Sequence, residues 1–169
     1  SGNTLYYAAT VRDIAQRLQL KSDLQESEAR YRGLFESAAD AIVILQGATL
    51  VDCNPRALQM FGLASVDQLA SRASFDFFPA LQPNGKDSRA FSVEKLSAAR
   101  AGAPQFFAWR HVKVDGTMFD AEVSLSTFKL GEQTFIQAII RDITQRTQLE
   151  EALRLGELRY RSLFENAGD

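Results

Sequence analysis

The side chains with the widest chemical range in this 169-residue chain are its single histidine and single cysteine, His111 and Cys53. Both fall in stretches whose residues favour β-strands, far apart in the sequence. A zinc site needs several such ligands, and a Cys–His nucleophile needs both side chains together. No motif pairs two carboxylates for acid–base work, and no glycine-rich loop is suited to phosphate. The sequence therefore predicts no catalytic residue and no metal site, and we do not expect an enzyme.

The cellular setting is indicated by cysteine content and charge. One cysteine in an apolar run favours a buried, inert thiol and a reducing compartment, hence a cytoplasmic module, even if the parent protein is anchored in a membrane elsewhere. Lys and Arg total 19 against 21 Asp and Glu, a net charge of −2, and no basic stretch stands out. Nucleic acid is therefore not an expected partner. No apolar run approaches the ~20 residues of a membrane span, so no membrane contact is expected in this fragment.

An internal repeat predicts how the chain is divided. Residues 11–40 match residues 140–169 at about 17 of 30 positions without gaps. The offset of 129 residues fits a whole domain plus its linker, repeated in tandem. Residues 1–15 are predicted to be either the last strand (Leu5 to Ile14) and exit motif of a preceding copy or the start of a linker. The other predicted parts are a linker helix at 16–36, one full copy at 37–146, and a second linker helix with the start of a third copy at 147–169.

Both linker helices carry apolar residues at alternating spacings of four and three, the pattern of a short coiled coil. The small residues Ser27 and Gly156 weaken one matching layer in each. We expect these helices to pair in parallel with those of a second chain, giving a homodimer. The predicted seam residues are Leu20, Leu24, Tyr31, Leu34, Leu149 and Leu153, and the pattern continues to Tyr160 and Leu163.

The full copy reads as an α+β domain. Asn54 and Pro55 open a helix that ends at Gly62, and Ser88 is expected to cap a longer helix ending near Ala101. The sheet must be antiparallel, because the only long connection joins the second and third strands. Expected strands are 41–45, 49–53, 105–114, 117–128 and 134–141, with short helical turns at 65–69 and 74–78 and a loop at 79–87.

Several motifs, taken in order, resemble a PAS domain over residues 30–146. They are RYRGLFESAADAIVIL at the entry, CNPRA at the helix opening, WRHVKVDG at the hairpin and RDIT at the exit. The resemblance implies a five-stranded sheet in the order 2-1-5-4-3 with helices on one face, flanked by linker helices. It also implies a small cavity and a sensory or dimerising role in a multi-PAS bacterial signalling receptor, such as a two-component system. Output would come from adjacent domains of the same polypeptide, such as a histidine kinase, a cyclic-dinucleotide enzyme or a chemoreceptor.

The resemblance also bears on cofactors. Haem-binding relatives usually take their axial histidine from the helices over the sheet, whereas His111 falls in a strand and is expected to be partly exposed. Haem is therefore disfavoured. Flavin photosensors carry N-C-R-F-L-Q, and Cys53-Asn54-Pro55-Arg56 has a different order at an earlier helix. This segment is interpreted as a lookalike, while non-covalent flavin binding stays open.

Aromatic residues gather where the resemblance places the cavity wall: Phe61, Phe75, Phe77, Phe78 and Phe91. Two interpretations remain. The cavity takes a small apolar or aromatic ligand and the module is a sensor, or the core is filled and the module only dimerises and relays. The predicted pocket residues are Ile42, Ile44, Phe61, Phe75, Phe78, Phe91, Trp109 and Val123.

The exit from the domain carries a second predicted site. Asp142, Thr144 and Gln145 form the signal-exit motif, in which Asp142 and Gln145 have the spacing of a capping box. Such a cap fixes the angle between the last strand and the helix that leads to the next domain, so a change in the sheet would turn that helix.

Overall fold

The computed structural model describes the backbone of residues 2–166 and the side chains of residues 14–162. It divides into two units, residues 1–38 and 39–169. The first consists of one helix, α1 (Gly2–Ser37). The strand expected over residues 5–14 is wrong for this chain, because that segment is helical. A lone terminal strand has no partner for its amides and carbonyls, whereas a helix satisfies them internally.

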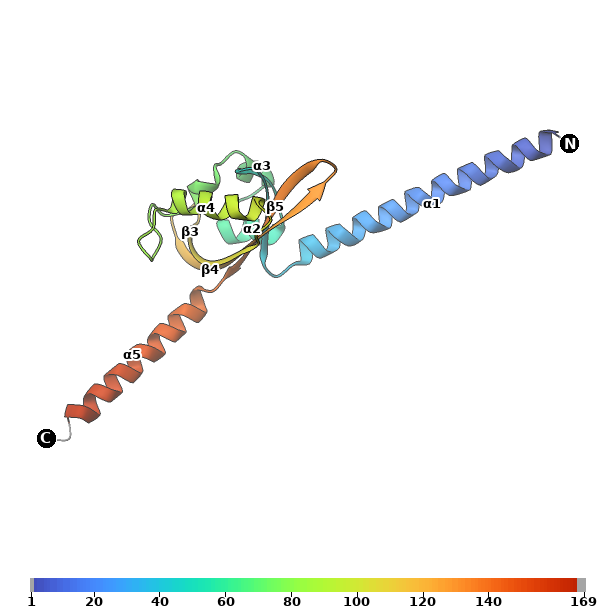
Figure 1. Cartoon of the computed structure of the whole chain (residues 1–169). Coiled ribbons are helices and arrows are strands. Elements are labelled where there is room, and N and C mark those ends of the chain that lie inside the picture. The colour runs from blue at the N-terminus through green and yellow to red at the C-terminus, as the bar shows by residue number, and fades with distance from the viewer. Residues whose placement is uncertain (1, 167–169) are drawn as a thin grey trace. The chain divides into compact units, whose positions relative to one another are not determined.

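The second unit contains a five-stranded antiparallel sheet in the order β2-β1-β5-β4-β3, which confirms the predicted topology (Figure 1). α5 follows the last strand directly. The elements are β1 (Ala41–Gln46), β2 (Thr49–Cys53), α2 (Pro55–Phe61), α3 (Val66–Ala70), the 3₁₀ helix η1 (Ser74–Phe77), α4 (Ser88–Arg100), β3 (Gln105–Val112), β4 (Met118–Leu130), β5 (Gln133–Asp142) and α5 (Thr144–Asn166).

The predicted cap at Asn54 joins α2 to the sheet. Its Oδ1 accepts from the amides of Ala57 and Ile42, both at 2.9 Å, and its Nδ2 donates to the carbonyl of Asp40 at 3.0 Å. Asn54 is fully buried, so each of these bonds replaces water. One side chain therefore caps the helix and holds the start of β1.

The end of α2 and the start of α4 are each determined by residues next to them in the sequence. α2 ends at Gly62, whose φ of +76° suits glycine, and a Cβ there would lie 3.1 Å from Val114. The expected cap of α4 at Ser88 is wrong by one residue. The Asp87 carboxylate accepts from the amide of Ala90 at 2.8 Å, because a carboxylate suits the positive end of a helix. The Ser88 hydroxyl instead accepts from the side chain of Gln82.

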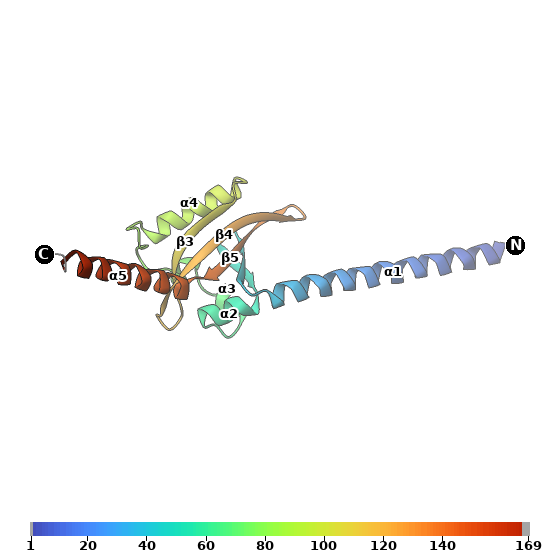
Figure 2. The same cartoon turned by 90° about the horizontal axis from the view of Figure 1, so that it is seen from below.

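The core lies between one face of the sheet and the helices. Along β4, Phe119, Ala121, Val123 and Leu125 are buried, and the residues between them lie on the opposite face. α4 runs across β3, β4 and β5 (Figures 1 and 2), while α2 packs on β1 and α3 on β2. This arrangement leaves the aromatic residues of η1, α4 and β3 facing each other.

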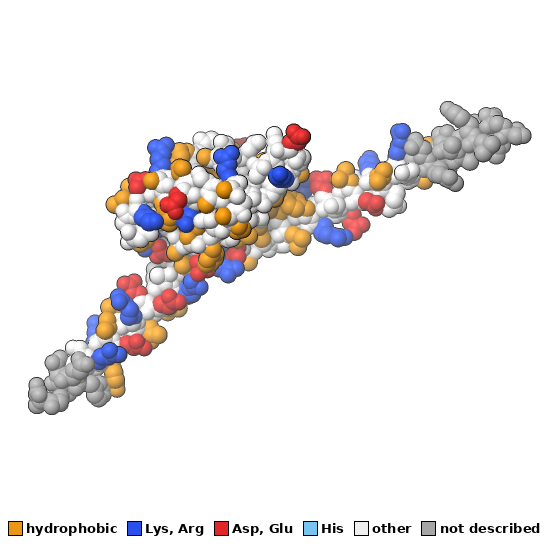
Figure 3. Space-filling model, in the orientation of Figure 1, with side chains coloured by type: hydrophobic (Ala, Val, Ile, Leu, Met, Phe, Trp, Pro, Cys, Tyr) orange, Lys and Arg blue, Asp and Glu red, His pale blue; other side chains and the backbone are white. Residues whose placement is uncertain are grey.

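In the described part of the chain, no helix is both long and apolar enough to cross a membrane. In Figure 3, hydrophobic side chains stand between charged ones along the described parts of α1 and α5.

Candidate functional site

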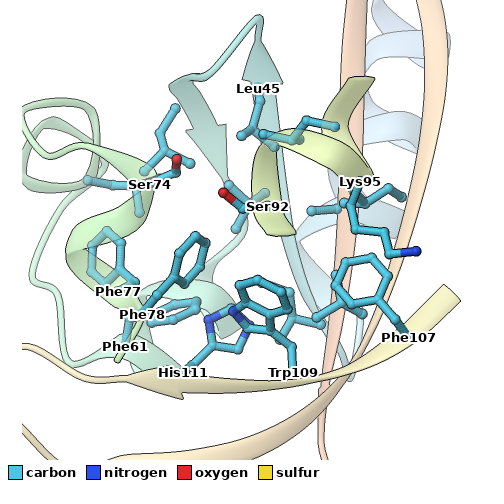
Figure 4. Close-up of a pocket in the computed structure, with 18 residues that line it drawn as sticks. Leu45, Phe61, Ser74, Phe77, Phe78, Ser92, Lys95, Phe107, Trp109 and His111 are labelled. Atoms are coloured by element: carbon cyan, nitrogen blue, oxygen red, sulfur yellow. The ribbon is translucent and has the colours of Figure 1, made fainter. Parts of the chain in front are cut away.

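A cavity of about 80 Å³ lies between the sheet and the segment formed by η1 and α4 (Figure 4). Its wall is mostly apolar and is formed by residues of the sheet and of the helices that cover it. The lining residues are Val43, Leu45, Leu50, Phe61, Leu69, Ser74, Phe77, Phe78, Ser92, Lys95, Leu96, Phe107, Trp109, His111, Val123, Leu125, Ala138 and Ile140. A volume of this size corresponds to about five to seven water-sized spheres.

One side of the cavity is a cluster of rings from β3 and the residues after α3. The Phe78 ring packs against Trp109 at 5.0 Å and against His111 at 5.6 Å between centroids. Phe61 adds an edge contact to His111 at 5.2 Å. Figure 4 shows His111 and Trp109 side by side in this cluster. Residues two apart in a strand share a face, which places both on the cavity side of β3.

His111 is the largest departure from expectation. It is 4% exposed rather than partly exposed, because loop 79–87 and η1 cover the β3 edge. Burial lowers the pKa of its imidazole to about 3, although the backbone of Phe77 raises it in part. Neither ring nitrogen makes a hydrogen bond to a described residue, and neither does Nε1 of Trp109. The sequence could have predicted this burial, because His111 lies two residues after Trp109 in the same strand and its side chain therefore lies on the same face of the sheet.

The structure brings together only some of the predicted pocket residues. Phe61, Phe78, Trp109 and Val123 line the cavity. Ile42 and Ile44 do not, because Val43 and Leu45 are the residues of β1 that face inward.

Two predicted ring residues also lie outside the lining. Phe75 is 37% exposed, with the Arg89 guanidinium 4.2 Å from its ring centroid. Phe91 packs behind the wall on Trp109 at 5.4 Å, with the Lys86 ammonium 4.3 Å from its ring. Phe77, in the same short helix as Phe75, is the residue that turns inward.

Few polar groups border the cavity besides the two rings. The Ser92 hydroxyl donates to the carbonyl of Arg89 at 2.9 Å. The Lys95 ammonium donates to Oε1 of Gln105 at 3.2 Å, which holds its charge at the rim. The sequence analysis did not predict Ser74, Ser92 and Lys95 as cavity residues. They border the cavity only because η1 and α4 pack against the sheet, which no local pattern indicates.

Cys53 does not line the cavity. Burial, with a smaller effect of Asp52, raises the pKa of its thiol to about 11, so the thiol is protonated at neutral pH.

The predicted exit motif lies on the opposite face of the same strands. The Thr144 hydroxyl accepts from the amide of Asp120 at 3.0 Å, and the amide of Ile143 donates to the carbonyl of Asp120 at 2.8 Å. The Arg146 guanidinium pairs with Glu122 at 2.6 Å. β4 therefore holds the first turn of α5 by both backbone and side chains.

The expected capping box is wrong in both halves. Asp142 accepts from the amide of Thr144 at 2.9 Å, two residues on. Within the described residues, no hydrogen bond joins Gln145 to Asp142. Residue 142 still belongs to β5, so its side chain forms a turn before the helix rather than a cap on it.

Comparison with protein families decides the fold family. The family model described as PAS domain matches residues 39–145. The chain belongs to the PAS domain family. This PAS domain is 24% identical to the PAS domain of an HTR-like protein from Haloarcula marismortui, with a TM-score of 0.61 over 74% of this chain and 98% of that one. A PAS domain from a two-component sensor histidine kinase gives a TM-score of 0.55 at 21% identity, covering 72% of this chain and 98% of that chain.

Curated relatives extend the match into the linker helices. Sporulation kinase E of Bacillus subtilis is 27% identical over 97% of this chain and 21% of its own length. The methyl sulfide methyltransferase-associated sensor of Methanosarcina acetivorans is 27% identical over 88% of this chain and 14% of its own length. The chain spans 14 to 23% of the length of the curated relatives it matches.

These matches identify the chain as a sensory signal-transduction module. PAS domains are typically non-catalytic, although two of the relatives are named as kinases.

Proposed function

We propose that this PAS module binds a small, mainly apolar molecule in its cavity and passes the resulting change to α5, and through it to an output domain of the same polypeptide. The observation that carries the proposal is the position of β4 between the two sites. Val123 and Leu125 line the cavity on its inner face. Asp120 and Glu122 bond Thr144 and Arg146 of α5 on its outer face.

A strand couples its two faces because successive side chains share one rigid backbone. A ligand that separates β4 from α4 also moves the amide of Asp120, to which Thr144 is bonded. The coupling requires that the ligand binds two arrangements of the strand and helix with different affinity. Ile140 strengthens the link, since it lines the cavity three residues before Ile143 leaves β5.

The second part of the proposal concerns association. The seam side chains that the structure describes are exposed in the single chain, including Leu24 at 67% and Leu153 at 66%, while Leu163 lies outside the described side chains. Pairing these helices in parallel with a second copy would bury them and give a dimeric relay to adjacent PAS and output domains. The salt bridge between Arg30 and Glu26, at 2.8 Å, joins two residues of the same helix, and neither of them is a predicted seam residue. The single buried thiol agrees with a module that works in the cytoplasm.

The cavity and the relay are tested in one experiment on the whole chain with toluene as the probe. The indole N–H of Trp109 gives a single NMR signal, because the chain has one tryptophan. Amide exchange at residues 143–147 reports the first turn of α5. We expect a saturable shift of the indole signal and an exchange change of about two-fold or more at these amides.

Ser92→Leu fills the cavity and should abolish both responses. Ser97→Leu places the same side chain at an exposed position of α4 and should keep them. Binding without any exchange change at residues 143–147 would reject the relay. Absence of binding in both the parent chain and the Ser97→Leu variant would reject the sensor and leave a filled-core module that only dimerises and relays.

Association is tested separately by light scattering. The parent chain should have the mass of a dimer at high concentration, and Leu24→Glu should make it a monomer by burying a charge in the seam. Leu18→Glu is the matched control, since Leu18 is equally exposed on α1 but lies off the seam. Equal behaviour of the two variants would contradict the seam assignment.

A further inference from the structure

β3 is an edge strand of the sheet, and its backbone groups alternate in direction. It is the last strand in the order β2-β1-β5-β4-β3 (Figure 1). In an edge strand only every second residue directs its amide and carbonyl to the one neighbouring strand. The amide of Asp120 in β4 donates to Thr144 and its carbonyl accepts from Ile143, so these groups point away from β3. Arg110 lies opposite Asp120 in the ladder and therefore directs its own amide and carbonyl outward, to the edge.

Both ends of this edge are closed by the chain itself. The side-chain amide of Gln82 accepts from the amide of Arg110 at 2.7 Å and donates to its carbonyl at 3.2 Å, as a neighbouring strand would. At the other end stands Pro104, which has no amide hydrogen to donate. The open part of the edge is therefore the segment 105–109.

Phe106 and Ala108 are the residues of this segment that present backbone groups to solvent. They precede Arg110 at every second position, so their amides and carbonyls also point outward. Among the described residues, none of these groups has a hydrogen-bond partner. Both side chains lie on the outer face of the sheet and are exposed, Phe106 at 71%. No residue from 105 to 109 is charged, although a charged side chain is a common guard of such an edge.

A second copy of the same segment complements this edge. When two antiparallel copies meet with Phe107 on the two-fold axis, Phe106 lies opposite Ala108 of the second copy. Every outward amide then meets an outward carbonyl, and the large exposed ring covers the small side chain. One position further out, Arg110 lies opposite Pro104 of the second copy, so the groups that Gln82 already occupies face the residue without an amide hydrogen.

The charges around the edge also fit this arrangement. Arg110 is the first charged residue beyond the open segment, and its guanidinium is paired with Asp120 of its own chain at 2.7 Å. In the antiparallel register it faces a proline, so no like charges lie opposite each other. The alternating donors and acceptors of the edge complement their own two-fold image.

We propose that the open edge of β3 is an interface between two copies of this chain, paired antiparallel about Phe107, so that their sheets join into one. This contact uses neither the cavity nor the seam of the linker helices. A pairing of so few residues is weak, so it forms at millimolar concentration or between chains that other contacts already hold together.

Amide exchange in the full chain measures the pairing. All samples carry Leu24→Glu, which removes the seam from the measurement. Exchange at Phe106 and Ala108 should slow about two-fold or more when the concentration rises from about 0.05 to about 1 mM, because paired amides are protected. The amides of Phe107 and Trp109 face β4 and should not change, which makes them internal controls.

Two charged variants place the effect at the edge. Ala108→Lys puts an ammonium into the paired segment and should abolish the concentration dependence at Phe106. Gln137→Lys introduces the same side chain on the same face of the sheet, in β5, which has a neighbour on both sides, and should keep it. Amide chemical shifts establish that each variant is folded.

Disulfide formation tests the register, in chains that also carry Cys53→Ala. In the proposed pairing the two Phe107 Cα atoms lie about 4.5 Å apart, whereas the two Ala108 Cα atoms lie more than about 7 Å apart. Phe107→Cys should therefore oxidise to a covalent dimer at least about five-fold faster than Ala108→Cys. Exposure alone predicts the reverse, since Ala108 is exposed and Phe107 is half-buried.

Each outcome bears on this interface alone. Exchange at Phe106 and Ala108 that does not depend on concentration would overturn the pairing. A dependence that survives Ala108→Lys, or that Gln137→Lys abolishes equally, would assign it to another surface. Faster oxidation of Ala108→Cys would overturn the antiparallel register about Phe107. Because the seam is broken in the exchange samples and no ligand is added, none of these results decides the ligand site or the linker-helix dimer.

Discussion

Replacing His111 by Phe should stabilise the ligand-free protein and remove most of its acid sensitivity between pH 7.5 and 5. His111 is the only histidine in the chain and is 4% exposed. Its neighbours are the rings of Phe61, Phe78 and Phe119, none of which is charged. A phenylalanine retains the stacking on Phe119 and needs no hydrogen bonds. The gain at neutral pH should be about 1–2 kcal/mol, because two buried nitrogens without partners are removed.

The pH dependence follows from the difference between the folded and unfolded pKa. Burial holds the pKa of His111 at about 3 in the folded protein, against an ordinary value of 6.5 for an exposed histidine. Above pH 6.5 the imidazole is neutral in both states and has no effect on the slope. As the pH falls below 6.5 the unfolded state takes up a proton that the folded state does not, and stability falls by about 1.4 kcal/mol per pH unit. Between pH 7.5 and 5 the loss amounts to about 2 kcal/mol.

Urea unfolding followed by the fluorescence of Trp109, the only tryptophan, measures this loss at each pH. The variant retains every carboxylate of the parent chain, so the difference between the two pH profiles isolates the histidine. The difference should open below pH 6.5 and grow steadily to pH 5. Parallel profiles would mean that His111 is protonated in the folded protein or reaches water, and the account of the cavity would have to be abandoned.

Four further predictions concern the supports of the site. Asn54→Ala should lower the free energy of unfolding by about 3 kcal/mol in chemical denaturation, because a cap is lost and buried groups of β1 lose their partner, whereas a loss below 1 kcal/mol would contradict that role. Phe78→Ala should cost about 2–3 kcal/mol, less than for a fully buried ring, and a neutral effect would place Phe78 outside the ring cluster. Asp142→Ala should cost about 1 kcal/mol in the same denaturation experiment, because the amide of Thr144 loses the carboxylate to which it donates, and no change at all would contradict that bond. Thr144→Val should speed amide exchange at Asp120 without unfolding the sheet, and unchanged exchange would show that the bond between β4 and α5 does not hold in solution.

The sequence determined the order of elements and most of their ends. The spacing of turn residues, the alternation along 119–126 and the Asn54-Pro55 pair are local signals, and local signals are enough to set strands, turns and caps. The motifs of the PAS resemblance then supplied the topology, which no local pattern contains. The interpretation of residues 5–14 as a strand was wrong, because a local pattern does not show whether a partner strand is present, and this segment is helical.

The cavity was decided by tertiary packing. Residues 41–45 are all apolar, so no alternation indicates which of them face inward, and a shift of one residue exchanges Ile42 and Ile44 for Val43 and Leu45. Which phenylalanine of η1 turns inward depends on the angle at which that helix meets β3. The burial of His111 depends on loop 79–87, where Gln82 accepts from the amide of Arg110 at 2.7 Å and closes the sheet edge. These contacts join residues distant in sequence, and their burial therefore exists only once the chain has folded.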